Sequence, residues 1–196
     1  MNAEVATHEP FSPRSEVGPY RSAQYFELPD EPRYELLFGR LHMAPSPSSR
    51  HQRVVLLLSE IFLRAARQSG GKVLTAPIDV VISDHSVVQP DLLYVSGGRR
   101  SIIQDRVVGV PDLIVEVISH GTARRDRGEK LRLYADAGVK EYWLVDPVNR
   151  YIDFLIGHEG AFEVILAEDD RYRSPLFPEI HIHLADFWQE IDGMEL

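Results

Sequence analysis

Three apolar segments between residues 87 and 145 have the length and composition of buried β-strands. They are Val87–Val95 (VVQPDLLYV), Asp112–Ile118 (DLIVEVI) and Glu141–Val145 (EYWLV). Nearly continuous runs of Val, Ile and Leu are typical of strands that are covered on both faces. We therefore expect these three segments to form the centre of a sheet.

Two segments have the apolar spacing of amphipathic helices. In Ser49–Gln68, apolar residues recur every three or four positions, and Gly70 follows as a C-terminal signal. A second helix is predicted to begin with Thr122 as its cap and to end at Gly138. Together with the three strands, these helices indicate a mixed α/β sheet with helices on its faces.

Shorter elements are predicted at both ends of this core. Arg21–Leu28 is expected to form a short helix, and residues 33–44 (RYELLFGRLHMA) two short strands that turn at Phe38–Gly39. Lys72–Ser83 is predicted as one strand, bent at Pro77, and Gly97–Gly109 as a basic loop. After residue 146 we expect three strands: Tyr151–Ile156, Phe162–Leu166 and Ile180–Leu184. One helical turn, Ala185–Glu190, is expected to follow them.

Length and composition fit one domain. Residues 1–20 are polar and proline-rich and are predicted to be a disordered leader, with residues 21–196 as a single domain. The chain has no cysteine, which excludes disulfides, thiolate metal sites and cysteine nucleophiles. No apolar run reaches the roughly 20 residues of a membrane span, and the N-terminus lacks the pattern of a secretory signal. A soluble cytoplasmic protein is expected.

The net charge of −9 is unevenly distributed along the chain. Residues 36–132 carry 14 Lys and Arg against 9 Asp and Glu, whereas residues 133–196 carry 4 against 14. A basic half of this kind is compatible with contacts to phosphates, although an unevenly charged soluble surface would give the same counts.

Two acidic residues, Asp91 and Glu116, interrupt runs that otherwise indicate buried strands. A buried carboxylate is costly unless a cation or a metal pairs with it. Asp112 is a weaker partner for Glu116, because four residues along one strand separate them by roughly 13 Å. Asp91 belongs to another strand, which can lie beside Glu116. We therefore predict that Asp91 and Glu116 converge.

Such a pair suits a hard cation such as Mg²⁺, which prefers oxygen ligands. Lys130, on the second helix, is the candidate ammonium beside the pair, and Arg124, Arg125 and Arg127 are candidate phosphate contacts. The alternatives are that Lys130 is a solvated helix lysine and that Glu116 pairs with an arginine for structural reasons. His51, in the first turn of the first helix, is either a packing residue or part of the site.

Four stretches carry a resemblance to a known family: YELLFGRLHMAPSPSSRHQ, QPDLLYVS, PDLIVEVIS and TARRDRGEKLRLYADAGVKEYWLVDP. From about Tyr34 to the C-terminus the chain resembles the Uma-type family of restriction-endonuclease-like proteins, within the PD-(D/E)XK nuclease superfamily. The resemblance implies a restriction-endonuclease-like mixed β-sheet core flanked by helices, here with extra N- and C-terminal strands. It also implies a phosphodiesterase that depends on Mg²⁺ or Mn²⁺.

In the family pattern, Asp91 and Glu116 match the metal-binding acids. The lysine expected two residues after the second acid is absent, since that position is Ile118. Lys130 on the following helix is the match instead. His51 and Glu35 fall in similar stretches and are expected to support the site from behind the metal ligands.

The main hypothesis is a nuclease that acts on nucleic acid, with DNA as the expected substrate and a homodimer compatible with cutting two strands. One alternative is a non-catalytic binding or scaffold protein that keeps the fold, which the isoleucine at 118 and the acidic tail favour. A third is a hydrolase for a smaller phosphorylated substrate.

Overall fold

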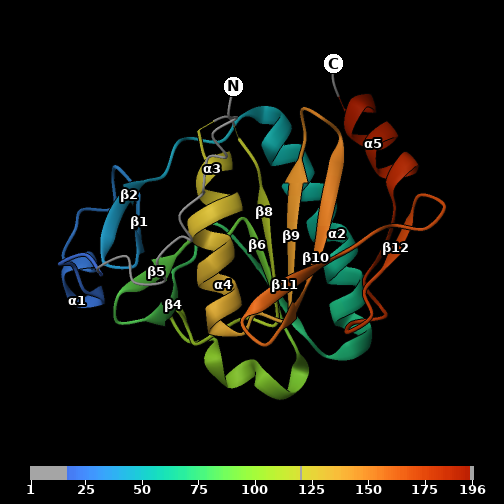
Figure 1. Ribbon diagram of the computed structural model, residues 1–196. Coiled ribbons are helices and arrows are strands. Elements are labelled where there is room, and N and C mark those ends of the chain that lie inside the picture. Colours follow the sequence, from blue (N-terminus) through green and yellow to red (C-terminus); the bar gives the residue numbers. More distant parts are fainter. Residues whose placement is uncertain (1–16, 120, 195–196) are drawn as a thin grey trace, which may run out of the picture.

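The computed structural model describes residues 17–119 and 121–194, which form two large β-sheets, a separate two-stranded hairpin and the helices that pack against them (Figure 1). Residues 1–16 of the predicted leader lie outside the described residues. Its last four residues are ordered, contrary to the prediction: the backbone N–H of Gly18 donates to Phe38 O at 2.7 Å, and that of Tyr20 to Gly39 O at 3.1 Å. No helix in the described part of the chain is long and apolar enough to cross a membrane.

The larger sheet has six strands in the order β11-β10-β9-β8-β6-β3. Its centre is formed by β6 (Leu92–Val95), β8 (Leu113–Val117) and β9 (Glu141–Asp146), which confirms the predicted central sheet. Strands β8 and β9 are parallel, as expected for two strands joined by a helix, whereas β6 is antiparallel to β8. Every residue of β6 and β8 is buried, because a helix packs against one face of the sheet, and a helix together with residues of a second, smaller sheet packs against the other.

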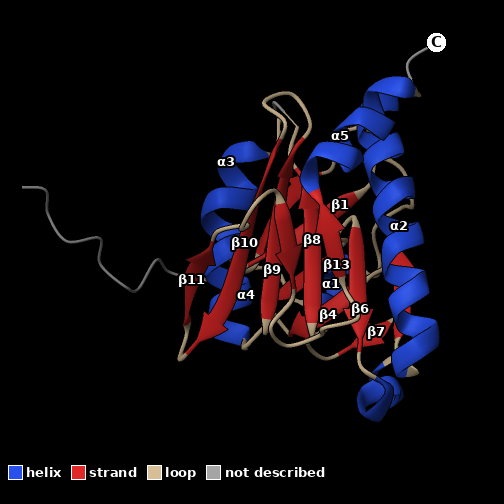
Figure 2. Cartoon of the chain, turned by 90° about the vertical axis from the view of Figure 1, so that its right-hand side faces the viewer, coloured by secondary structure: helices blue, strands red, loops and turns tan. Residues whose placement is uncertain are grey.

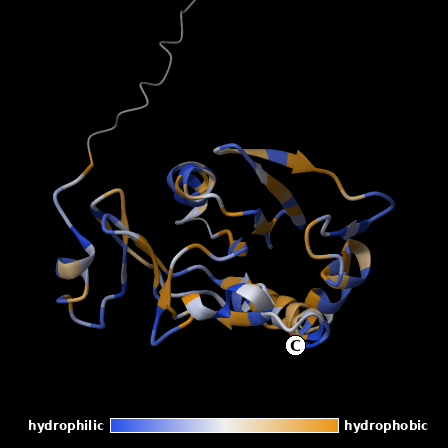
Figure 3. Cartoon of the chain, turned by 90° about the horizontal axis from the view of Figure 1, so that it is seen from below, coloured by the Kyte–Doolittle hydropathy of each residue, from blue (hydrophilic) through white to orange (hydrophobic). Residues whose placement is uncertain are grey.

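Helix α2 (Ser49–Ser69) covers one face of this sheet, and the segment around α4 (Leu131–Ala137) covers the other (Figure 2). The Ser48 hydroxyl accepts a hydrogen bond from the His51 N–H at 3.2 Å and so caps α2. Gly70 ends the helix in the left-handed conformation, with φ of 73°. In Figure 3 the helices carry both hydrophobic and hydrophilic residues, as amphipathic covering helices should.

The smaller sheet has five strands in the order β2-β1-β5-β4-β7. The predicted hairpin is present as β1 (Tyr34–Leu37) and β2 (Arg40–Met43), with Phe38 and Gly39 at positive φ in the turn. The other strands are β4 (Val80–Ser83), β5 (Ser86–Val88) and the unpredicted β7 (Val107–Val108).

Two predicted long strands are each divided between the sheets. Val87–Val95 becomes β5 in the smaller sheet and β6 in the larger one, and Lys72–Ser83 becomes β3 (Lys72–Thr75) in the larger sheet and β4 in the smaller one. The breaks contain Pro90 and Pro77, which have no N–H to donate to a strand ladder. The prediction of continuous strands was therefore wrong at two places where the chain crosses between sheets.

The predicted helix 122–138 consists of three pieces: α3 (Ala123–Arg125), a π-helical turn (Asp126–Lys130) and α4, which ends at Gly138 with φ of 81°. The prediction that Thr122 caps it was wrong. The Thr122 hydroxyl accepts instead from the Ser119 N–H at 3.1 Å, and no side-chain cap is present. A π-helical turn widens the helix locally and often marks a functional site.

The C-terminal part extends the larger sheet with β10 (Tyr151–His158) and β11 (Ala161–Ile165). A separate hairpin follows, made of the unpredicted β12 (Arg171–Arg173) and of β13 (His181–His183). The last helix, α5 (Leu184–Gly193), is longer than the single turn expected. Two further short helices lie near the smaller sheet and in the predicted basic loop: α1 (Ser22–Tyr25) and a 3₁₀ helix (Gly97–Ile102).

Asp112, just before β8, joins several parts of this fold. Its side chain is fully buried and accepts hydrogen bonds from Ser96 N and Arg99 at 2.9 Å, and it lies 2.7 Å from Lys140 Nζ. Burial by itself would raise the pKa of Asp112, but the bonds from Lys140, Ser96 and Arg99 outweigh it and lower that pKa. The prediction that Asp112 is a strand-start residue, not a partner of Glu116, agrees with this position.

We expect Asp112→Asn to lower the free energy of unfolding by about 2–4 kcal/mol at pH 7, because buried bonds to charged donors are lost. The folded pKa of Asp112 is depressed, so its contribution is complete above the unfolded pKa of about 3.9 and is lost as pH falls through the folded pKa. Urea unfolding at pH 7 and pH 3 measures both effects. The exposed Glu60→Gln control should change stability by less than about 0.5 kcal/mol. If the wild type and Asp112→Asn differ in unfolding free energy as much at pH 3 as at pH 7, the charge of Asp112 is not the cause of the difference.

Candidate active site

The antiparallel pairing of β6 and β8 brings the two predicted acids together. Leu92 is paired with Val115, so Asp91, the residue before Leu92, lies beside Glu116. The Asp91 carboxylate accepts a hydrogen bond from the Val117 N–H at 2.7 Å, which holds it against β8. The segment that crosses from β5 in the smaller sheet to β6 in the larger sheet thus ends at Asp91, beside Glu116.

Lys130 reaches this pair from the π-helical turn. Its Nζ lies 2.8 Å from Glu116 Oε1, 2.9 Å from Glu35 Oε1 and 3.7 Å from Asp126 Oδ1. Only 4% of Lys130 and 3% of Glu116 is exposed to solvent. The alternative of a solvated lysine is therefore excluded, and Glu116 pairs with Lys130 instead of an arginine.

Glu35 brings the smaller sheet into the cluster. It lies on β1, and its Oε1 accepts from the Gln89 N–H at 2.8 Å as well as from Lys130. Its Oε2 lies 4.0 Å from the Arg125 guanidinium. The predicted supporting residue Glu35 is thus in direct contact with the ammonium.

His51 approaches Asp91 from the first turn of α2. Its Nε2 lies 3.1 Å from Asp91 Oδ2, and among the described residues its buried Nδ1 has no hydrogen-bond partner. His51 therefore contacts Asp91 directly and also lines the same pocket, and its supporting role stays a prediction.

A pocket of about 300 Å³ opens over these groups, between the two sheets. Asp91, Glu116, Lys130 and Asp126 all line it, and Arg125 and Arg33 supply positive charge to its wall. Of the other predicted phosphate contacts, Arg124 is exposed and does not line the pocket. Arg127 also lies outside it, bound to Asp153 at 2.8 Å and to the Tyr151 hydroxyl on β10.

Carboxylates outnumber cations in the cluster. Burial raises the pKa of Glu116 well above its usual range; Lys130 opposes this effect, and Asp126 and Asp91 add to it. Burial also raises the pKa of Asp126. Burial would lower the pKa of Lys130, but Glu116, Glu35 and Asp126 raise it well above normal, so the amine stays charged.

The donor chemistry of the cluster fits a small divalent cation. The hydrogen bonds among the described residues use one oxygen of each acid, Oδ2 of Asp91 and Oε1 of Glu116. No group of three or more His, Asp or Glu side chains within residues 17–119 and 121–194 is arranged as a complete metal site. Mg²⁺ does not require one, since one or two carboxylates, waters and substrate phosphates commonly hold it.

Sequence reasoning missed three members of the cluster: Asp126, Tyr134 and Gln89. The Tyr134 hydroxyl donates to Glu116 Oε1 at 2.7 Å. A signal was available for two of them, because Asp126, Lys130 and Tyr134 are spaced four residues apart and such a spacing places side chains on one helix face. For Gln89 the decisive contact is made by the backbone, which the residue type does not reveal.

Comparisons with known proteins bear on this geometry. The family model Uma2, described as "Putative restriction endonuclease", matches residues 22–185. The chain belongs to the Uma2 family. A relative, the "Uncharacterized protein slr1290" of Synechocystis, is 26% identical over 164 residues, which is 83% of this chain and 85% of that protein.

A solved structure shares the fold. The crystal structure of a "putative nuclease belonging to DUF820" from Anabaena variabilis superposes with a TM-score of 0.73 at 19% identity, covering 88% of this chain and 99% of the other. The predicted restriction-endonuclease-like family and its mixed α/β fold are thereby confirmed.

Replacing Lys130 by methionine should destabilise the protein by about 3–5 kcal/mol, because it leaves Glu35, Glu116 and Asp126 buried without their cation. Unpaired buried carboxylates bind protons more tightly in the folded than in the unfolded state, so the loss should be larger at pH 8 than at pH 5. Chemical denaturation at both pH values measures this. The exposed Lys72→Met serves as the matched control. An equal loss at both pH values would mean that charge is not the cause.

Proposed function

We propose that this Uma2-family protein is a metal-dependent nuclease that hydrolyses phosphodiester bonds in nucleic acid, with DNA as the expected substrate. The observation that carries the proposal is the convergence of Asp91 and Glu116 beside the buried Lys130 ammonium in one pocket. Membership of a family described as restriction endonucleases supports the same reaction class.

Each residue has a distinct part in this proposal. Asp91 and Glu116 would hold Mg²⁺ or Mn²⁺, which when bound polarises the phosphodiester and lowers the pKa of water. Lys130 holds Glu116 through Oε1 and places positive charge next to the developing phosphate charge. Glu116, or a water at the cation, would help to activate the nucleophile.

Two other groups support the acids. His51, through Nε2, and the Val117 N–H both bind Oδ2 of Asp91 and leave Oδ1 for a ligand. Tyr134 orients Glu116 from the opposite side of the sheet to α2. We assign both side chains positioning roles, because each contacts a proposed metal ligand.

Asp91→Asn should abolish detectable Mn²⁺ binding by titration calorimetry and lower cleavage of plasmid and single-stranded DNA by at least about 100-fold. The substitution removes a charge that the cation needs but keeps the shape of the side chain. Circular dichroism should be unchanged, since asparagine can still accept the Val117 N–H.

The matched control is Asp136→Asn, an exposed aspartate on α4 that does not line this pocket, and it should retain both properties. If the wild-type protein binds no divalent cation at millimolar concentration, the proposal is wrong.

Arg125 and Arg127 provide a second test, because they are neighbours on one helix with different surroundings. Arg125 lines the pocket, whereas Arg127 is held by Asp153. We expect Arg125→Ala to weaken DNA binding and to reduce the slope of log affinity against log salt by about 1. Arg127→Ala should leave both nearly unchanged in fluorescence anisotropy titrations. Equal effects of the two substitutions on DNA binding would show that the DNA phosphates contact the outer surface of the helix and not the pocket.

A non-catalytic nucleic-acid-binding protein is the second candidate, and one observation favours it. The Lys130 ammonium is already bound by Glu116 and Glu35, so a phosphate must compete with two carboxylates for it. Retained binding of DNA at low salt, with intact substrate in Mn²⁺, would select this function. Hydrolysis of nucleotides but not of polynucleotides would select the smaller substrate considered from the sequence.

A further inference from the structure

A second pocket, of about 490 Å³, lies beside the candidate active site and shares part of its wall. Arg33, Pro77 and Gln89 line both pockets. The volume lies within the range of roughly 300–1,000 Å³ that is typical of sites for small molecules or single groups. A ligand with its phosphate in the first pocket can therefore extend directly into the second.

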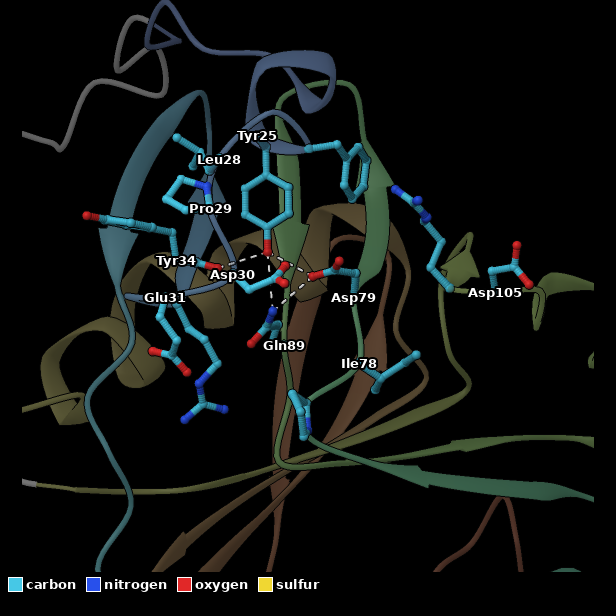
Figure 4. Close-up of a pocket in the computed structure, with 14 residues that line it drawn as sticks. Tyr25, Leu28, Pro29, Asp30, Glu31, Tyr34, Ile78, Asp79, Gln89 and Asp105 are labelled. Atoms are coloured by element: carbon cyan, nitrogen blue, oxygen red, sulfur yellow. Dashed lines mark hydrogen bonds between the residues drawn. The ribbon is translucent and has the colours of Figure 1, made fainter.

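The second pocket combines aromatic rings with a polar floor (Figure 4). Tyr25, Phe26 and Tyr34 supply the rings, and Phe26 keeps 38% of its surface exposed, with the Arg106 guanidinium 3.8 Å from the ring centre. Exposed rings and guanidinium planes of this kind are the surfaces on which unpaired bases stack.

The floor is formed by Asp79, Gln89 and the Tyr25 hydroxyl, which are joined in one network. Asp79 Oδ1 accepts from Tyr25 at 2.8 Å and from Gln89 Nε2 at 3.0 Å. The hydrogen bonds among the described residues leave the second oxygen of Asp79 and the amide oxygen of Gln89 as acceptors. Burial and Asp79 raise the pKa of Tyr25, so its hydroxyl keeps its one proton, for which Asp79 Oδ1 and the Tyr34 carbonyl, 2.9 Å away, are the two acceptors.

Acidic side chains outnumber basic ones in both pockets, and the second has one cation fewer than the first. The second is lined by four acids and two arginines: Asp30, Glu31, Asp79, Asp105, Arg33 and Arg106. The acceptor oxygens in this lining favour a group rich in hydrogen-bond donors. A carboxylate accepts well from the exocyclic amino group of a base, whereas a carbonyl at the same position would repel it.

We propose that the second pocket binds one unpaired base of the nucleic acid, that it selects a base whose pairing edge carries an amino group, and that Asp79 reads this group. The inference rests on the proposed function for the placement of the adjoining phosphate. It adds the strand state and the base preference of the substrate.

The test uses the full chain in EDTA, where no cleavage occurs, and fluorescein-labelled (dC)₁₂ and (dU)₁₂. Cytosine has an amino group at C4 and no hydrogen on N3, whereas uracil has a carbonyl at C4 and an N3–H. We expect the wild-type protein to bind (dC)₁₂ roughly tenfold more tightly than (dU)₁₂. Asp79→Asn should remove this preference, since asparagine keeps an oxygen for Tyr25 and Gln89 but replaces the other acceptor by a donor. Asp136→Asn, which makes the same charge change on α4, outside both pockets, should keep the preference.

Equal affinities of the wild-type protein for the two oligonucleotides, or no binding of either, would overturn the inference. So would a folded Asp79→Asn that retains the preference. Displacement of (dC)₁₂ by an arginine-rich peptide that the wild-type protein binds more tightly would reassign the pocket to a basic protein segment.

Phe26→Ala is the second variant, because a half-exposed ring can be removed without disturbing the core. It should weaken the binding of both oligonucleotides by roughly tenfold and leave the ratio of their affinities unchanged, because stacking does not depend on the amino group. Unchanged affinities would exclude stacking on this ring and overturn the proposed base site. Failure of the two proposals is distinguishable: cleavage in Mn²⁺ without base preference rejects only the base site, and base preference without cleavage rejects only the nuclease.

Discussion

The buried ammonium of Lys130 is the interaction on which the candidate site depends. It binds Glu116 of the larger sheet and Glu35 of the smaller sheet, and Asp126 lies one turn before it. Removing a charge from water is costly, and close opposite charges offset that cost only in good geometry. The position of Lys130 is therefore fixed by partners from three parts of the fold. Any account of the site must begin with this fixed charge.

The two sheets meet where the chain crosses between them. The crossings at residues 76–79 and 89–91 lie next to each other, since Ala76 N donates to the Asp91 carbonyl at 3.1 Å. Both pockets open along these crossings, and Pro77 and Gln89 belong to both. Polar groups are found here because irregular backbone between two sheets leaves space that no regular element fills.

The sequence predicted the elements of the larger sheet well, because long apolar runs and helical spacing are strong local signals. It predicted that Asp91 and Glu116 converge, from the cost of burying acids and from the length of a strand. The roles of these residues stay predictions. The division of Val87–Val95 between two sheets was missed because apolar periodicity does not indicate which sheet a residue joins. The partner of Arg127, Asp153, is on a distant strand, and such a contact has no local signal.

Other errors have similar causes. Thr122 has the residue type of a helix cap, but the neighbouring Ser119 N–H takes its hydroxyl. Asp126 was not singled out as part of the site, although it lies four residues before Lys130 and is buried with it in the π-helical turn. Local patterns thus located the site, whereas the contacts that complete it depend on tertiary structure.

The crossing Gln89-Pro90-Asp91 is short, and its length has a consequence of its own. Its first residue is tied to Glu35 through the backbone, and its last is tied to Val117 through the side chain. With both ends anchored, an added or deleted residue would turn successive side chains of β6 to the opposite face of the sheet. Insertions and deletions are therefore tolerated far less at this linker than in the surface loops, and new segments are better inserted in those loops.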